Sequence, residues 1–338
     1  MDLKVILSVF ACSCYFAVLA LDNGLALTPP MGWLTWQRFR CITDCKKYPN
    51  ECISEALITR TADIMVKEGY LQAGYNYVGI DDCWLERERD EHGLLVPNKE
   101  RFPNGMKAIA DYLHNKGMKF ALYEDYGNLT CAGYPGVLGH EEVDVETFAN
   151  WDVDYVKLDG CYVETEKMDT SYPQFGKLMN KTGRPIVYSC SWPAYQKKPD
   201  YASIAKHCNL WRNYDDIQDS WGSLTNIMNW FGDNQADFAH YAGPGRWNDP
   251  DMIWTRELFD GSYAIAFVNQ RDDGAPHSVS VTFNDMKIEK QGYKVHDLYK
   301  EEENRYIGPK EKFETRINPS GVKFYKFTPN RLRAVEIV

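Results

Sequence analysis

Short apolar runs that end in polar or charged residues alternate with longer stretches of helical periodicity between residues 30 and 253. The runs are MGWLTW, YNYVGIDDCW, KFALYEDYG, VDYVKLDG, PIVYSCSW, NLWRNYDD and GRWNDPDM. Between them, residues 54–68 and 106–116 carry apolar side chains at helical spacing, and each stretch is followed by a glycine, Gly69 or Gly117. Short strands that alternate with helices indicate βαβ units and a parallel sheet.

The number of these units favours a TIM-type (β/α) barrel. The polar ends of the seven runs fall near residues 36, 82, 125, 159, 191, 216 and 251. A barrel of eight such units takes about 250 residues, and its active site gathers at the carboxyl ends of the strands. A doubly wound sheet is the alternative, but no glycine-rich phosphate loop follows the first run.

The pattern changes after Trp254. The runs SYAIAFVNQ, HSVSVTF, YKVHDLY, KFETRI and VKFYKFT alternate apolar and polar positions and are joined by Gly, Asp and Asn turns. No helical periodicity intervenes, which predicts a small antiparallel β-sandwich. We therefore expect a signal peptide at residues 1–20, a barrel domain at 21–253 and a β-sandwich domain at 254–338, and a chain of 338 residues is long enough for both domains.

The amino terminus predicts entry into the secretory pathway. Lys4 precedes the apolar run Val5–Leu19, and the small residues Val18 and Ala20 favour cleavage before Leu21. This run is too short to span a membrane, and no other segment is long and apolar enough, so we expect no membrane insertion. The net charge of −10 and the pI of about 5.3 argue against a nucleic-acid partner.

Eight cysteines remain after the predicted cleavage, and an even number in a secreted chain indicates disulfides. Their spacing matches no zinc-binding pattern, so we expect no metal, and nothing in the chain points to a cofactor. Two sequons, at Asn128 and Asn180, predict N-glycosylation.

Aspartates gather at the ends of the predicted strands: Asp81, Asp82, Asp125, Asp159, Asp215, Asp216, Asp249 and Asp251. A single such residue is usually a helix cap or an ion-pair partner. A ring of them at one face is harder to explain structurally, because like charges repel. Glycoside hydrolysis needs two carboxyl groups, one of which attacks carbon or activates water while the other protonates the leaving oxygen.

Asp159 is the strongest candidate for the attacking carboxylate. It ends the run VDYVKLDG, and Lys157 lies two residues earlier on the same face of the strand. A neighbouring cation favours the ionised form that a nucleophile requires, although a structural ion pair would have the same pattern. The proton donor stays open between Asp215 and Asp216 on this reasoning.

The strings GIDDCW, YVKLDGCY, YSCSWPAY, WRNYDDI and GPGRWNDPDM closely resemble glycoside hydrolase family 27, which holds the animal lysosomal α-galactosidases and α-N-acetylgalactosaminidases. The resemblance runs from Leu21 to NPSGVKFY near the carboxyl terminus. It implies a retaining double displacement, with Asp159 as nucleophile and Asp216 as acid/base. Retention predicts a separation of about 5–5.5 Å between the two carboxyl groups.

The resemblance also implies a set of sugar-binding and pocket-wall residues. Those matching sugar contacts are Asp81, Asp82, Lys157, Arg212 and Asp251, and those matching pocket walls are Trp33, Tyr123 and Met252.

Ser191 and Ala194 stand where the α-galactosidase pattern has a larger Glu and Leu. The smaller side chains leave room for a 2-acetamido group, which the Ser191 hydroxyl can bind. This resembles the α-N-acetylgalactosaminidase pattern and predicts cleavage of terminal α-linked N-acetylgalactosamine from glycans. An α-galactosidase is the alternative, because extra space does not exclude galactose.

The family resemblance further implies a homodimer in the lysosome or outside the cell. Eight cysteines allow 105 pairings by arithmetic alone. The family pattern implies the pairs Cys41–Cys83, Cys45–Cys52, Cys131–Cys161 and Cys190–Cys208.

One part of the family pattern is missing. After WNDPDM the family continues with a helix, an eighth strand and a further helix, whereas here Met252 and Ile253 lead directly into Trp254 and the β-rich module. On the order of 60–70 residues are absent, judged by the size of two barrel units. The sequence therefore predicts a barrel without its eighth strand and with unpaired strand edges. A poorly folded or inactive variant of such an enzyme is a further alternative.

Overall fold

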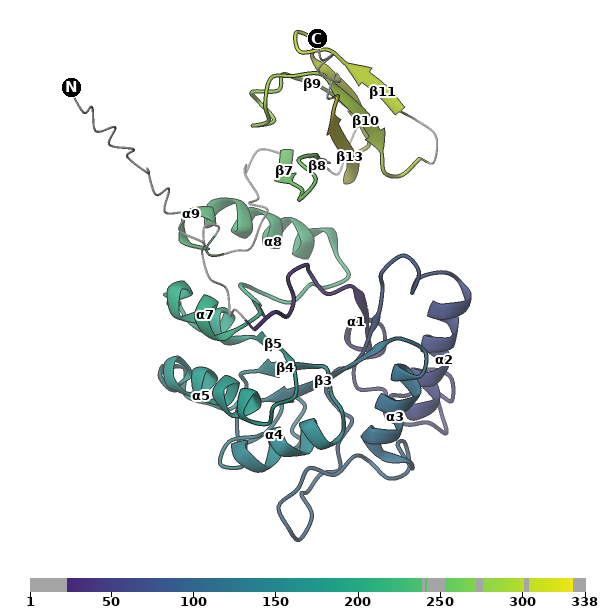
Figure 1. Cartoon of the computed structure of the whole chain (residues 1–338), viewed down its shortest axis with the longest axis vertical. Helices are drawn as coiled ribbons and strands as arrows, with labels where there is room; N and C mark the ends of the chain where they lie inside the picture. The colour runs from purple at the N-terminus through teal and green to yellow at the C-terminus, as the bar shows by residue number, and fades with distance from the viewer. Residues whose placement is uncertain (1–22, 239–240, 242–252, 272–275, 301–303, 331–338) are drawn as a thin grey trace, which may run out of the picture.

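The computed structural model describes residues 23–238, 241, 253–271, 276–300 and 304–330. Their first part is a six-stranded parallel sheet in the order β1-β2-β3-β4-β5-β6, with helices along it (Figure 1). The strands are β1 (Gly32–Leu34), β2 (Tyr77–Ile80), β3 (Lys119–Asp125), β4 (Tyr155–Asp159), β5 (Val187–Cys190) and β6 (Leu210–Trp211). The helices are α1 (Trp36–Phe39), α2 (Glu55–Lys67), α3 (Gly105–His114), α4 (Glu141–Asn150), η1 (Thr165–Lys167), α5 (Met168–Lys181), α6 (Trp192–Tyr195), α7 (Tyr201–His207), α8 (Trp221–Asp233) and α9 (Gln235–Phe238).

Local signals explain where these elements begin and end. The Ser54 hydroxyl caps α2 by accepting the amide hydrogen of Leu57, whose side chain is buried with that of Ile58. Gly69 and Gly117, after α2 and α3, have φ angles of 82° and 74°, a conformation that glycine adopts without steric cost. Helical periodicity therefore located these two helices to within one or two residues.

The sheet curls into part of a barrel. Arg40, after β1, donates from Nη2 to Gln218 Oε1, after β6, over a distance of 2.8 Å. This hydrogen bond joins segments that follow the two outermost strands of the sheet, so the carboxyl ends of all six strands surround one space. The prediction of a (β/α) barrel type is confirmed.

The barrel is not closed among the described residues. Within them β1 pairs only with β2, and β6 pairs only with β5. Leu34 on β1 keeps 42% of its surface exposed, and a hollow of about 190 Å³ lies beside it, where Trp33, Tyr77 and Tyr155 contribute to the lining. A complete barrel fills its interior with side chains. The seventh predicted run, GRWNDPDM, lies outside the described residues.

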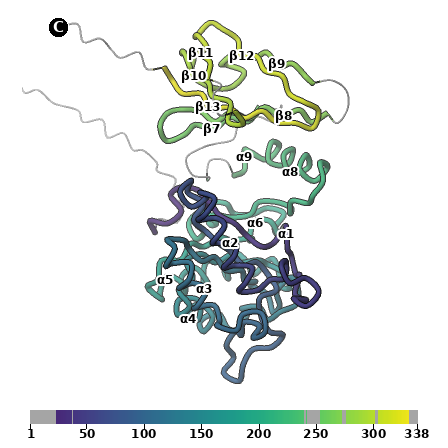
Figure 2. The backbone as a smooth tube through the Cα atoms, turned by 90° about the vertical axis from the view of Figure 1, so that its right-hand side faces the viewer, coloured from purple at the N-terminus to yellow at the C-terminus, as the bar shows by residue number. Residues whose placement is uncertain are grey.

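The second part is entirely β-structure (Figure 2). Its strands are β7 (Ile253–Glu257), β8 (Tyr263–Asn269), β9 (His277–Val281), β10 (Tyr293–Asp297), β11 (Asn304–Ile307), β12 (Phe313–Ile317) and β13 (Gly321–Pro329). Five of them form an antiparallel sheet in the order β11-β10-β13-β8-β7, and β12 pairs with β9. Phe267, Phe313 and Phe327 are buried together in the core of this part.

The sequence pattern located five of these seven strands and missed β7 and β11. The segment Ile253–Glu257 pairs antiparallel with β8, so it belongs to the carboxyl-terminal sheet and is not a barrel strand. Gln270, directly after β8, connects this part to α8: its carbonyl accepts from Trp221 Nε1 at 3.4 Å and its amide donates to Asn229 Oδ1 at 3.1 Å. None of the described helices has both the length and the apolar character needed to cross a membrane.

Candidate active site

The carboxyl ends of the six parallel strands surround a pocket of about 280 Å³. Its lining combines carboxylates, cations, aromatic rings and a disulfide: Trp36, Asp81, Asp82, Tyr123, Cys131, Lys157, Asp159, Cys161, Ala194, Tyr195, Arg212 and Asp216. These residues come from the end of every strand from β1 to β6. The parallel topology is therefore what brings together side chains that are up to 180 positions apart, as Trp36 and Asp216 are.

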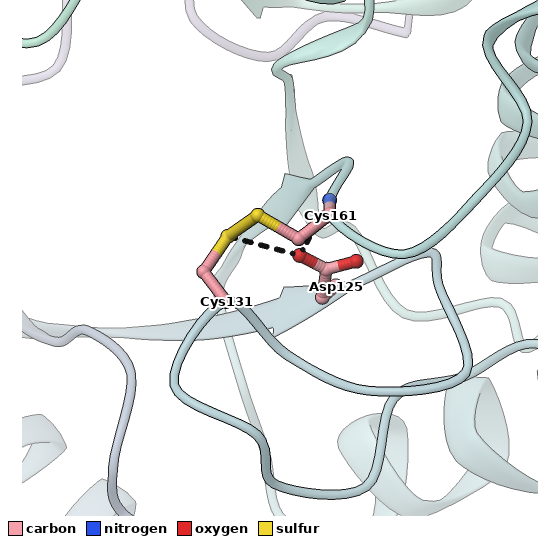
Figure 3. Close-up of side chains that lie close together, drawn as sticks. All are labelled: Asp125, Cys131 and Cys161. Atoms are coloured by element: carbon pink, nitrogen blue, oxygen red, sulfur yellow. Dashed lines mark hydrogen bonds between the residues drawn. A yellow bond between two sulfur atoms is a disulfide. The ribbon is translucent and has the colours of Figure 1, made fainter.

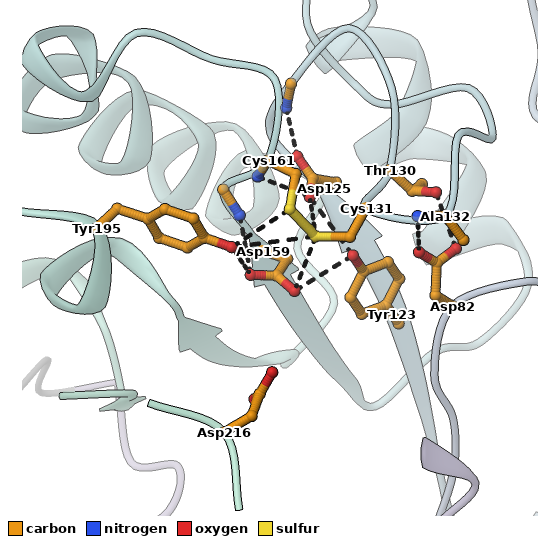
Figure 4. Close-up of a disulfide and its surroundings, with 12 residues drawn as sticks. Asp82, Tyr123, Asp125, Thr130, Cys131, Ala132, Asp159, Cys161, Tyr195 and Asp216 are labelled. Carbon is orange, nitrogen blue, oxygen red and sulfur yellow. Dashed lines mark hydrogen bonds between the residues drawn. A yellow bond between two sulfur atoms is a disulfide. The ribbon is translucent and has the colours of Figure 1, made fainter. Parts of the chain in front are cut away.

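Asp159 ends β4 and has only 6% of its surface exposed. Its Oδ1 accepts the Tyr195 hydroxyl at 2.7 Å and the Gly160 amide at 3.0 Å, and its Oδ2 lies 3.3 Å from the Tyr123 hydroxyl (Figure 4). Burial, together with the charge of Asp159, raises the pKa of both tyrosines, so each keeps its proton and donates it. Hydrogen bonds to a carboxylate favour its ionised form.

Lys157 binds Asp81 and not Asp159. Its Nζ lies 2.7 Å from Asp81 Oδ2, and Asp81 is 1% exposed. Burial alone would lower the pKa of Lys157, but the carboxylates of Asp81 and Asp159 outweigh it, and the pKa is raised. The Lys157 ammonium therefore keeps its positive charge. It attracts the Asp159 carboxylate electrostatically but forms its direct ion pair with Asp81.

Asp82 is held by the loop that follows β3. Its Oδ1 accepts the Thr130 hydroxyl at 2.8 Å and the Cys83 amide at 2.6 Å, and its Oδ2 accepts the Ala132 amide at 2.8 Å. Burial raises the pKa of Asp82, and these three hydrogen bonds oppose the rise. Thr130 was not among the predicted site residues, because its side chain meets Asp82 across 48 positions of sequence.

Asp216 faces the pocket, whereas Asp215 is exposed and does not line it. Arg212 Nη2 lies 3.3 Å from Asp216 Oδ1, and the Asp216 side chain keeps 46% of its surface exposed. Figure 4 shows Asp216 across a space from Asp159. Of the two adjacent aspartates, only Asp216 is therefore placed to reach a molecule in the pocket.

The predicted pocket walls are placed in part. Tyr123 and Ala194 line the pocket, but Trp33 lies in the hollow along the strands, and Trp36 takes the wall position three residues later. Ser191 is 2% exposed and stands directly before α6, outside the lining. The predicted contacts Asp251 and Met252 lie outside the described residues, as does the predicted signal peptide. Tyr195, whose hydroxyl holds Asp159, was missed by the sequence analysis.

Four disulfides join the cysteines in the pairs that the family pattern implies: Cys41–Cys83, Cys45–Cys52, Cys131–Cys161 and Cys190–Cys208. The third joins the loop after β3 to the loop after β4 and forms part of the pocket wall (Figure 3). Asp125, Cys131 and Cys161 lie close enough to resemble a metal site. Because both sulfurs are committed to the disulfide, they are not available as thiolate ligands. The sequon residues Asn128 and Asn180 are both exposed.

Comparison with known proteins identifies the family. Residues 28–266 match the family model of alpha galactosidase A, and residues 249–327 match that of the alpha galactosidase C-terminal beta sandwich domain. The chain belongs to glycoside hydrolase family 27. Every described residue that lines the pocket of this family 27 chain lies within the first matched region.

Individual members of family 27 match most of the chain. It is 52% identical over 260 residues to the α-N-acetylgalactosaminidase of Gallus gallus, which covers 75% of the chain and 63% of that relative. It is 50% identical over 238 residues to α-galactosidase A of Homo sapiens, which covers 69% of the chain and 56% of that relative. The chain therefore spans less than two thirds of the length of these relatives. The crystal structure of α-galactosidase I from Mortierella vinacea shares the fold, with a TM-score of 0.66 and 23% identity over 91% of this chain and 98% of that one.

Proposed function

We propose that this chain carries a retaining α-glycosidase site that removes terminal α-linked N-acetylgalactosamine from glycans. The observation that carries the proposal is the placement of Asp159 and Asp216 in one pocket at the carboxyl ends of the strands. Sugar-binding groups surround them, namely the carboxylates of Asp81 and Asp82 and the cation of Lys157. Charged groups of this kind form strong, directional hydrogen bonds and are suited to the recognition of sugar hydroxyls.

The proposed reaction is a double displacement. The Asp159 carboxylate attacks the anomeric carbon while Asp216 donates a proton to the leaving oxygen, and a glycosyl ester forms on Asp159. Asp216 then takes a proton from water, which attacks the anomeric carbon and releases the sugar with its configuration retained. The donors on Asp159 support the first step because they hold the attacking carboxylate in a fixed orientation at the pocket.

A mechanism-based inhibitor tests this site directly. A galactose-configured epoxide that esterifies the nucleophile is incubated with the secreted protein, and the labelled peptide is mapped by mass spectrometry. We expect the label on Asp159, and we expect Asp159→Asn to remain unlabelled. Labelling of a different residue would show that the nucleophile is misassigned.

The preference for N-acetylgalactosamine over galactose is a finer proposal. Relatives with either name match the chain about equally, at 52% and 50% identity, so overall similarity does not decide it. The small Ala194 in the pocket wall supports room beside the 2-position of the sugar. We expect aryl α-N-acetylgalactosaminide to be cleaved faster than aryl α-galactoside, and Ser191→Glu with Ala194→Leu to reverse the ratio. Faster cleavage of the α-galactoside by the wild type would favour the α-galactosidase alternative, and an unchanged ratio in the double variant would show that these two positions do not set the preference.

The open sheet favours a second candidate, a variant without activity. Within the described residues β1 and β6 have unpaired edges, and the two family matches overlap at residues 249–266, where the missing segment is expected. Circular dichroism and the labelling experiment together separate the candidates. Folded protein that takes no label supports the inactive variant, and labelled protein rejects it.

We also propose that the chain is lysosomal or secreted and that it forms a homodimer. Size-exclusion chromatography of the secreted protein tests the homodimer.

A further inference from the structure

Asp125 lies beside the proposed nucleophile but does not line the pocket. It ends β3 directly opposite Asp159 in the register of β3 and β4, and it is fully buried. Its Oδ2 is 3.4 Å from the Tyr123 hydroxyl, which is also 3.3 Å from Asp159 Oδ2 (Figure 4). Sγ of Cys131 lies 3.4 Å and 3.5 Å from the same two carboxyl oxygens. Two carboxyl groups therefore converge on one hydroxyl and one sulfur.

A single hydroxyl cannot serve two carboxylates. The Tyr123 hydroxyl has one proton to donate, so only one of the two acids receives it. Two carboxylates that share a site also repel each other, and one of them tends to keep a proton. The surroundings decide which one, and they differ between Asp125 and Asp159.

Asp159 is the better site for the negative charge. It accepts the Tyr195 hydroxyl as well, and it borders the pocket that also contains Lys157. Asp125 accepts the amides of Gly127 at 2.7 Å and Cys161 at 3.0 Å, but no cation of the described residues forms an ion pair with it. Burial, and then the charge of Asp159, raises the pKa of Asp125 to about 8.

We propose that Asp125 is a positioning residue that holds a proton at acidic pH and passes a hydrogen bond through Tyr123 to Asp159. In this arrangement the Asp125 carboxyl donates to the Tyr123 oxygen, and the Tyr123 hydroxyl donates to Asp159 Oδ2. Loss of the Asp125 proton leaves two carboxylates in competition for the one Tyr123 hydroxyl, so Asp159 shares or loses the hydrogen bond that orients it for attack. The inference rests on the proposed function and explains how the nucleophile keeps the Tyr123 hydrogen bond to itself in an acidic compartment.

Other titratable groups face Asp125 from each element packed against it. They are Asp82 after β2, Tyr123 and Glu124 on β3, Asp159 on β4, Tyr172 on α5 and Tyr195 on α6. Burial raises the pKa of Tyr123, Tyr172 and Tyr195, so these hydroxyls stay neutral. Asp82 and Glu124 are therefore the carboxyl groups whose own titration has to be distinguished from that of Asp125.

Glu124 provides the matched control. It precedes Asp125 on β3, is equally buried, and points to the opposite side of the strand, where its Oε2 accepts the Asp125 amide at 3.0 Å. It makes no hydrogen bond to Tyr123 or Asp159 among the described residues. Glu124→Gln therefore removes a buried acid from the same strand, keeps an oxygen that can accept the Asp125 amide hydrogen, and leaves the side chains of Asp125, Tyr123 and Asp159 unchanged.

The first measurement does not depend on activity. Protein labelled with carboxyl-¹³C aspartate is titrated from pH 5 to pH 9 while the carbonyl band of protonated aspartic acid is followed by infrared spectroscopy. We expect a band that disappears near pH 8 in the wild type and in Glu124→Gln and is missing in Asp125→Asn. Wild-type spectra without such a band overturn the inference even if Asp125→Asn fails to fold.

The second measurement follows the attack by Asp159 through the pH dependence of kcat/KM. A dinitrophenyl α-galactoside is used because its leaving group departs without a proton from Asp216. Above about pH 8, kcat/KM is expected to fall in the wild type and in Glu124→Gln, but not in Asp125→Asn, because only an ionised Asp125 competes with Asp159 for the Tyr123 hydroxyl. An Asp125→Asn profile equal to that of the wild type overturns the inference. Absence of turnover in folded wild-type protein overturns the proposed function instead, and the infrared band then decides on Asp125.

Discussion

At the scale of single residues, Thr130 lies outside the pocket lining but orients Asp82, which lines the pocket. Three donors from two segments hold its carboxylate, and the only side chain among them is Thr130, which is itself fully buried. Thr130 is also the third residue of the sequon that begins at Asn128. One residue is thus predicted to serve both glycosylation and the orientation of a sugar-binding carboxylate.

The two roles of Thr130 are separable by substitution. Thr130→Ala removes the hydrogen bond and the sequon, Asn128→Gln removes only the sequon, and Thr130→Ser keeps both. A hydrogen bond to a charged group contributes about 1.5–3 kcal/mol, so we expect Thr130→Ala to raise KM by about tenfold or more with a smaller change in kcat. Steady-state kinetics on an aryl α-glycoside checks this. If Asn128→Gln shows the same rise, the glycan is responsible and not the hydroxyl.

Glu124 is predicted to make stability depend on pH. It is fully buried, and its Oε1 has no hydrogen-bond partner among the described residues. Burial, and then the charges of Asp144 and Asp125, raises its pKa well above the ordinary value of 4.5. The folded state thus binds a proton that the unfolded state releases, so this contribution to stability is complete below pH 4.5 and is lost as the pH rises towards the folded-state pKa.

We therefore expect the Tm of the wild type to fall between pH 4.5 and pH 7.5, and Glu124→Gln to fall less. Differential scanning calorimetry over this range checks the difference. Burial also raises the pKa of Asp125 and Asp82, so part of the wild-type slope persists in the variant. A steeper fall in Glu124→Gln would contradict the assignment.

At the scale of elements, the loop between β3 and α4 is the connection on which the site most depends. It carries Thr130 and Ala132, which hold Asp82, and the disulfide Cys131–Cys161 fastens it to the end of β4. The Cys161 amide in turn donates to Asp125. Loops tolerate change in general, but this one is held at several points because it orients carboxylates from two strands.

Removal of this disulfide should affect catalysis beyond its effect on stability. It closes a span of 30 residues, and Cys45–Cys52 closes one of 7, which corresponds in the chain-entropy description to about 3.6 and about 2.4 kcal/mol. We expect the double Ser variant of Cys131 and Cys161 to lose most kcat/KM at a temperature where it is still folded. The double Ser variant of Cys45 and Cys52 serves as control and should lose stability only. If the two double variants lose kcat/KM equally, the loop between β3 and α4 has no particular role in catalysis.

At the scale of the whole molecule, the open sheet is the main departure from a closed barrel. Within the described residues β1 has an unpaired edge, and Leu34 on that strand is 42% exposed. Unpaired edges with apolar side chains promote association between chains. The chain nevertheless keeps the ends of β1 and β6 together through Arg40 and Gln218, which accounts for a formed pocket in an open sheet.

Self-association through the open edge is testable with two leucines of equal exposure. Leu34 lies on β1, and Leu298, also 42% exposed, follows β10 in the carboxyl-terminal sheet. We expect Leu34→Lys to lower the mass of soluble aggregates measured by light scattering, and Leu298→Lys to leave it unchanged. An equal decrease in both variants would indicate a general effect of added charge.

The sequence by itself determined the six strands of the barrel part, helices α2 and α3, the change to β-structure near residue 254, and the aspartates at the strand ends. These follow from local periodicity and from residues such as Ser54 and Gly69, which act on their own neighbours. The motif around Asp159 could be assigned to the family from sequence because its residues are consecutive in the chain. A motif of consecutive residues can be recognised without information on which segments lie side by side in the fold.

Only the tertiary structure decided the partners within the site. It placed Lys157 on Asp81, which is 76 positions away, and not on Asp159, which is two positions away. It also brought Tyr195 to Asp159 and put Trp36 in the pocket wall in place of Trp33. The physical reason is that a side chain binds the group that strand adjacency and loop path bring within about 3 Å, and neither is encoded in local periodicity.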